Sequence, residues 1–131
     1  MTPALSRYRL PRRNRLQRQR EFDGVRAQGT RAVRGCLIAN WLPLAAGTEC
    51  RLGVVLSLKV GPAVFRSRAR RLLREAFRRH QHEFRSPVAL ILVARPSIAG
   101  KPFAFVERDL LRLLGEARLL AESTPTVVGA S

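Results

Sequence analysis

The stretch that decides the fold is a basic segment in the middle of the chain, Gly61-Pro62-Ala63-Val64-Phe65-Arg66-Ser67-Arg68-Ala69-Arg70-Arg71-Leu72-Leu73-Arg74-Glu75-Ala76-Phe77-Arg78-Arg79. At about 100° per residue, its pattern predicts a helix with two unlike sides. One side collects Phe65, Ala69, Leu72, Leu73 and Ala76, and the other collects Ser67, Arg70, Arg71, Arg74 and Arg78. Gly61 is suited to the preceding turn, and Pro62 to a first helical turn, where its missing N–H is not needed. We therefore expect a helix that buries one side and presents arginines on the other.

The arginine side carries an energetic cost, because like charges four residues apart, such as Arg66 and Arg70, repel each other by a few tenths of a kcal/mol. The whole chain is similarly basic, with a net charge of +16 over 131 residues. Such a charge favours a polyanion as the partner. The alternative is a solvated arginine face with no partner, and the helix alone leaves both open.

Upstream of this segment, the residue pattern predicts one helix and the first strands of a sheet. Arg15–Gln28 has helical spacing of its apolar residues, and Gly29 ends it. Cys36–Leu44 and Cys50–Val60 have the apolar runs of strands, which we expect to pair as a hairpin. A short strand around Thr30–Val33, or the first half of the Cys36 segment, would complete an antiparallel meander.

Downstream, Val88–Ala94 is almost wholly apolar, which is typical of a central strand covered on both faces. Phe105–Ala121 returns to helical spacing. The basic helix then lies between two strands that we expect to pair in parallel. The order α-β-β-β-α-β-α predicts a two-layer α/β (α+β) sandwich.

The length of the chain is that of one domain. We expect residues 1–14 to form a basic flexible arm, residues 15–121 the domain, and residues 122–131 a disordered tail. Cys36 and Cys50 are too far apart for a zinc ribbon or a redox pair, and we interpret them as buried strand thiols in a reducing compartment. No stretch has the length of a membrane span or the apolar core of a signal peptide. These features predict a cytoplasmic protein.

The residues do not predict a catalytic or metal-ligating site. The common hydrolase and phosphate-binding motifs do not occur, and His80 and His82 do not share a helical face. Arginines interleaved with aromatic residues favour single-stranded RNA over duplex DNA, because unstacked bases need aromatic platforms. Phe22 and Trp41 are candidates for stacking, and burial in the core is the alternative for each.

Three parts of the chain resemble one known family. The run from Lys59 to Arg78 resembles the signature of the bacterial ribonuclease P protein, K-x-G-x-A-V-x-R-N-R-x-[KR]-R-x-x-R-E-x-F-R. The N-terminal helix of that family is similar to Arg15-Leu16 followed by Glu21-Phe22, Val25 and Gly29. The end of its last strand is similar to Val93-Ala94-Arg95-Pro96. The similarity spans nearly the whole predicted domain in the same order.

The resemblance implies an α/β sandwich with a left-handed β-α-β crossover at the basic helix, an exception to the usual hand. It also implies an auxiliary subunit of an endoribonuclease, in which a catalytic RNA with bound Mg²⁺ removes the 5′ leader of precursor tRNA. The partners would be the catalytic RNA and precursor tRNA, with no DNA and no membrane. The alternative is a ribosomal-protein-like or general RNA-binding chaperone protein without a role in cleavage.

The same resemblance implies that one set of residues faces the catalytic RNA: Arg66, Ser67, Arg68, Arg70, Arg71, Arg74 and Arg78. It implies that a second set lines a cleft for the leader: Phe22, Arg26, Asn40, Lys59 and Arg95. Ser67 replaces the usual Asn of the family's triplet, and Arg26 stands where a second aromatic residue is common. Asn40 stands where the strand often carries Tyr. Trp41 follows it, and an offset of one residue predicts that Trp41 points to the other face of the sheet.

Overall fold

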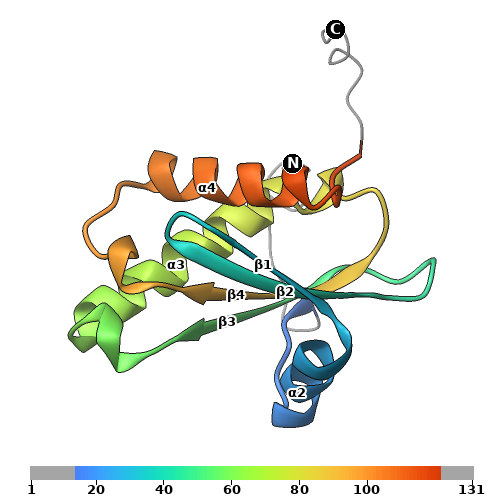
Figure 1. Ribbon diagram of the computed structural model, residues 1–131, viewed down its shortest axis with the longest axis horizontal. Helices are drawn as coiled ribbons and strands as arrows, with labels where there is room; N and C mark the ends of the chain where they lie inside the picture. The colour runs from blue at the N-terminus through green and yellow to red at the C-terminus, as the bar shows by residue number, and fades with distance from the viewer. Residues whose placement is uncertain (1–13, 122–131) are drawn as a thin grey trace, which may run out of the picture.

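The computed structural model describes residues 14–121 (Figure 1). Its helices and strands are α2 (Gln19–Gln28), β1 (Thr30–Arg34), β2 (Leu37–Pro43), β3 (Arg51–Leu56), α3 (Ala63–His80), β4 (Val88–Ala94) and α4 (Phe103–Glu116). Three short 3-10 turns are η2 (Leu58–Val60), η3 (Gln81–Glu83) and η4 (Pro96–Ile98). The order α-β-β-β-α-β-α and the mixed α+β class agree with the prediction. The predicted arm (1–14) and tail (122–131) lie outside the described residues, apart from Asn14.

The four strands form one sheet in the order β1-β2-β4-β3. β4 is central, as its apolar run predicted, and it pairs antiparallel with β2 and parallel with β3. β1 pairs antiparallel with β2, as expected. The predicted hairpin of β2 with β3 is wrong, because β4 lies between them and pairs with both. The left-handedness of the β3-α3-β4 crossover connection stays a prediction.

Each face of the sheet has its own helices (Figure 1). α3 and α4 cover one face, where the larger apolar cluster includes Leu73, Phe77 and Leu90. α2 packs on the other face, over a smaller cluster that includes Val25 and Ile91. Because α2 is short, part of this second face stays open.

The basic helix α3 is held against the sheet by Ala69, Leu73, Ala76 and Phe77, which are all buried. Phe65 was predicted on the same apolar side but is 46% exposed. It lies in the first turn, beyond the sheet, where its ring packs over Gly61. The part of α3 that is buried against the sheet is therefore its central and C-terminal part.

Several predicted boundaries differ from the structure. The strand predicted over Cys50–Val60 ends at Leu56, because the Ser57 side chain accepts a hydrogen bond from the Lys59 N–H and starts the 3-10 turn η2. α2 begins at Gln19 instead of Arg15, since residues 14–16 run along the edge of β3. Asn14, assigned to the arm, is buried and bonded to Glu49 and to the Cys50 carbonyl.

The two cysteines are not strand residues. Cys36 lies in the β1–β2 turn and is buried, and Cys50 directly precedes β3 and is half-buried. The carboxylate of Asp109 in α4 accepts a hydrogen bond from the Cys36 N–H at 3.1 Å. Burial, with Asp109 beside it, raises the pKa of the Cys36 thiol to about 12. Asp109 thus fixes the turn against α4, and the thiol stays protonated.

Candidate nucleic-acid interface

Five of the seven residues predicted to face the catalytic RNA lie together on α3. We call them the arginine surface: Ser67, Arg70, Arg71, Arg74 and Arg78, which line one shallow hollow together with Glu75. Their spacing repeats every three or four residues, so all five project from the same side of the helix. The arginine surface lies opposite the buried residues that hold α3 on the sheet.

The other two predicted arginines are turned aside. Arg66 Nε donates a hydrogen bond to the Gly61 carbonyl at 3.2 Å, back toward the start of the helix. Arg68 Nη2 donates to the Lys101 carbonyl at 2.8 Å, before α4. Both side chains fasten α3 to neighbouring loops and flank the arginine surface on opposite sides.

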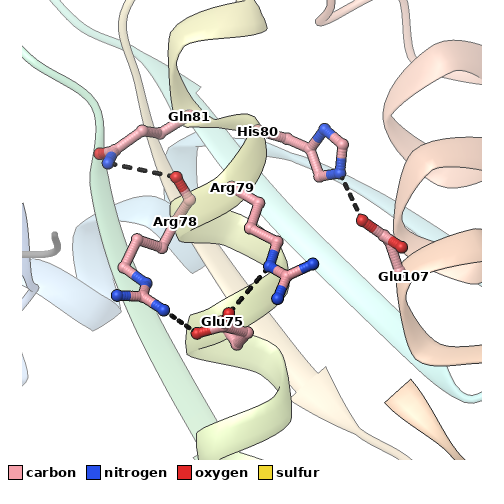
Figure 2. Close-up of polar contacts among 6 residues, drawn as sticks. All are labelled: Glu75, Arg78, Arg79, His80, Gln81 and Glu107. Carbon is pink, nitrogen blue, oxygen red and sulfur yellow. Dashed lines mark hydrogen bonds and ion pairs between the residues drawn. The ribbon is translucent and has the colours of Figure 1, made fainter. Parts of the chain in front are cut away.

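Glu75 divides the basic residues into paired and unpaired groups. It accepts hydrogen bonds from Arg78 and, at 2.8 Å, from Arg79 Nε (Figure 2). Desolvation opposes ionisation of Glu75, but these two guanidinium groups outweigh it and lower the pKa of the carboxyl group. Arg70, Arg71 and Arg74 form no ion pair with any residue of the described part of the chain. The net positive charge of the surface therefore comes mainly from these three residues.

His80, at the end of α3, connects this helix to α4. Its Nδ1 and Nε2 atoms lie 2.8 Å from carboxylate oxygens of Glu83 and Glu107, and Figure 2 shows the second contact. Desolvation disfavours the imidazolium, but the hydrogen bonds to Glu107 and Glu83 outweigh it and raise the pKa of His80. Both contacts favour the imidazolium form of His80, which lies at the C-terminus of α3.

The leader-cleft candidates Phe22 and Asn40 lie on the face of the sheet that α2 covers. Gly53 in β3 and Asn40 in β2 both stand opposite Ile91 in β4, so the three form one row across the sheet. The Phe22 ring lies over Gly53, where a Cβ atom would come within 2.5 Å of the ring. Phe22 and Asn40 therefore flank Ile91, with the Cα atoms of Gly53 and Asn40 about 10 Å apart.

The next row on this face, Ile38, Val93 and Val55, is half-buried. We call these three residues the open strip. Sequence reasoning missed them, although their alternation with residues of the opposite face was a usable signal. It also missed Gly53, although a glycine inside a strand often marks the close approach of another group.

Lys59 and Arg95 lie at one end of the open strip. They follow β3 and β4, which are parallel neighbours with Leu56 opposite Ala94. Both are exposed, and Arg95 Nη1 donates to the Gly35 carbonyl at 3.0 Å. Arg26 is exposed one turn after Phe22 on α2. The open strip is thus an apolar surface with basic residues at its end.

Trp41 takes no part in this face. It is 8% exposed and belongs to the cluster under α3 and α4, as the offset of one residue predicted. Stacking of a base on Trp41 is therefore excluded, and the core alternative holds. Asn40 is also largely covered, at 9% exposure.

Within residues 14–121, no group of three or more His, Cys, Asp or Glu side chains could hold a metal ion. The residues that line the arginine surface include one carboxylate, and two arginines already pair with it. This donor set does not fit Mg²⁺, which prefers several oxygen ligands. Among the helices of the described part, none is long and apolar enough to cross a membrane.

The comparisons with known proteins all identify ribonuclease P proteins as similar to this chain. The pattern of the family described as Ribonuclease P matches residues 10–118. A ribonuclease P protein component from Desulfovibrio desulfuricans is 37% identical over 113 residues, which are 84% of this chain and 87% of the relative. Another, from Maridesulfovibrio salexigens, is 33% identical over 120 residues, 89% of this chain and 97% of the relative.

Two solved structures have a similar fold. A mutant of the Staphylococcus aureus RNase P protein, described as defective in mRNA degradation activity, matches with a TM-score of 0.78 and 19% identity over 92% of this chain and 100% of that chain. The RNase P protein from Thermotoga maritima matches with a TM-score of 0.66 and 24% identity over 75% of this chain and 92% of that chain.

Proposed function

Because the chain belongs to the ribonuclease P protein family and is a protein subunit of that endoribonuclease, we propose that it binds two RNAs in tRNA processing. The arginine surface binds the catalytic RNA. Phe22, Asn40 and the open strip bind the 5′ leader of precursor tRNA. Cleavage of the leader is carried out by the catalytic RNA, so the protein acts as an auxiliary subunit.

One observation carries the assignment of α3: Arg70, Arg71 and Arg74 lie without ion pairs, among the described residues, on one side of a helix whose other side is buried. Such an arrangement costs repulsion between like charges, and a polyanion removes that cost. Arginine is well suited to phosphate oxygens because its planar fork donates two hydrogen bonds at once. A helix held rigidly by its buried side presents these donors in a constant arrangement.

The leader assignment is supported by the chemistry of the other face. Single-stranded RNA presents unstacked bases, which bind aromatic and apolar surfaces, and phosphates, which bind cations. The Phe22 ring and the open strip supply the first kind of contact, and Lys59 and Arg95 supply the second. We propose that Arg26 and Ser67 contribute polar contacts at the edges of these two surfaces.

The Mg²⁺ required for cleavage would be held mainly by RNA, since the described protein residues offer no suitable set of oxygen ligands. The protein would act on it indirectly, because arginines that neutralise phosphates reduce the repulsion between two folded RNAs. Less Mg²⁺ would then be needed to bring precursor and catalytic RNA together.

The test is to add the purified protein to its cognate catalytic RNA and measure processing of precursor tRNA across a series of Mg²⁺ concentrations. We expect the protein to lower the Mg²⁺ concentration required. The same complex should bind precursor tRNA more tightly than mature tRNA. Absence of any effect on processing would refute the proposal, and equal affinity for both tRNAs would favour a general RNA-binding protein.

A further inference from the structure

A pocket at the outer edge of β3, the last strand of the sheet, joins the two proposed surfaces. It has a volume of about 400 Å³ and is lined by Arg15, Leu16, Gln17, Phe22, Leu52, Gly53, Val54 and Arg74. Phe22 comes from the leader-cleft candidates and Arg74 from the arginine surface. Arg15 was not among the predicted site residues, and none of the described residues that line the pocket is acidic.

The backbone of residues 14–16 determines where the Arg15 side chain goes. Arg15 forms a parallel bridge with Leu52, and the Leu16 N–H donates to the Leu52 carbonyl at 2.7 Å. Leu16 joins the apolar cluster under α2. Because successive side chains of an extended segment alternate in direction, Arg15 points to the opposite side, toward α3.

Further contacts hold this segment in position. Arg51 donates one hydrogen bond to the Arg15 carbonyl at 3.2 Å and another to Glu21 at 2.7 Å. The Gln17 and Arg18 N–H groups also donate to Glu21. The hydrogen bonds from Arg18 and Gln17, with a further contribution from Arg51, lower the pKa of Glu21 to about 2. The segment that carries Arg15 is therefore anchored at neutral pH.

Arg15 and Arg74 are two cations without a counter-ion among the described residues of this pocket. Arg15 Nε is buried and has no hydrogen-bond partner in the same part of the chain. Desolvation, followed by the charges of Arg15 and Arg70, lowers the pKa of Arg74. An anion bound between the two guanidinium groups would satisfy the buried donor and remove the repulsion.

We propose that this pocket binds one nucleotide of single-stranded RNA, with its phosphate between Arg15 and Arg74 and its base against Phe22. The inference rests on the proposed function and assigns the nucleotide to the precursor tRNA leader. Phe22 and Gly53 continue directly into the row of the sheet that leads to the open strip, so a strand bound there reaches the pocket. Arg74 then lies at the border between substrate and catalytic RNA.

The test uses the complex of the full-length protein with its catalytic RNA and compares Arg15→Gln with Arg112→Gln. Arg112 is exposed on α4, so its substitution controls for the loss of one positive charge. We expect Arg15→Gln to weaken the binding of precursor tRNA about tenfold, as for loss of a charge-assisted hydrogen bond. Its affinity for mature tRNA should stay within about twofold of the parent value. For precursor tRNA, the slope of log affinity against log salt concentration should become shallower by about 0.7.

A second measurement does not depend on a protein variant. Neutral methylphosphonate groups are placed one at a time along the leader, and the affinity of the parent complex should fall at one position. The Arg15→Gln complex should lose less affinity at that position than the parent complex does, because one of the two partners of the phosphate is already absent.

Three results with tRNA ligands would overturn the inference. They are an Arg15→Gln effect equal to that of Arg112→Gln, an equal loss for precursor and mature tRNA, and no sensitive phosphate in the leader. A loss confined to the affinity for catalytic RNA would also overturn it, because the phosphate would then belong to that RNA. If the parent complex itself does not distinguish precursor from mature tRNA, the proposed function fails. If it does and Arg15 has no effect, only the inference fails.

Discussion

Replacing Arg70 by alanine tests the arginine surface most directly. Arg70 has no ion pair within residues 14–121 and lies four residues from Arg74, on the side of α3 away from the core. Removing one arginine that neutralises a phosphate lowers the slope of log affinity against log salt by about 0.9, the value per phosphate contact for duplex DNA. When the salt concentration rises fourfold, both proteins lose affinity for the catalytic RNA. The fold-loss of the variant should be about 3.5 times smaller than the fold-loss of the parent.

The assay is a titration of the catalytic RNA with protein at several salt concentrations, with Arg112→Ala as the matched control for net charge. The melting temperature should be unchanged or slightly raised, because removing Arg70 relieves repulsion of a few tenths of a kcal/mol with its neighbours. An unchanged salt slope would show that Arg70 is only solvated, and the docking role of α3 would then be refuted.

Three further predictions concern other parts of the molecule. Asp109→Ala should lower the free energy of unfolding by about 1–3 kcal/mol, because the buried Cys36 N–H loses its acceptor; a thermal melt equal to that of the parent would contradict this role. The raised pKa of His80 means that its contribution to stability is complete below the unfolded-state pKa, about 6.5, and is lost as the pH rises through the folded-state pKa. Urea unfolding of the parent protein at a pH below and a pH above this range should show the loss of stability. The His80→Gln variant should not show this loss. Phe22→Ala should weaken the binding of precursor tRNA by about 1–3 kcal/mol, the usual contribution of one stacked base. An equal loss for mature tRNA, together with a sharply lowered melting temperature, would assign the ring to the core.

The parts of the fold that sequence predicted well depend on local patterns. Helical spacing identified α3 and the side that Leu73 and Ala76 bury, since both follow from the rotation per residue. The uninterrupted apolar run of β4 predicted a strand covered on both faces. The period of two along β2 also separated Asn40 from Trp41 correctly.

Strand pairing was predicted less well, because it depends on contacts between distant segments. The hairpin expected between β2 and β3 favoured the nearest strand in sequence. In the structure β4 enters between them, where its backbone groups pair on both sides. The exposure of Phe65 has a similar origin, because a helical pattern does not report where the sheet beneath it ends.

By itself, the sequence determined that the chain has a helix with one apolar and one arginine side, since a helical period is a property of neighbouring residues. The tertiary structure decided which of those arginines act together. It turned Arg66 and Arg68 toward loop carbonyls, paired Arg78 with Glu75, and left Arg70, Arg71 and Arg74 free of ion pairs within the described residues. It also placed Arg15 near Arg74 at the edge of β3. No local sequence pattern predicts this proximity, because it arises only when the sheet forms.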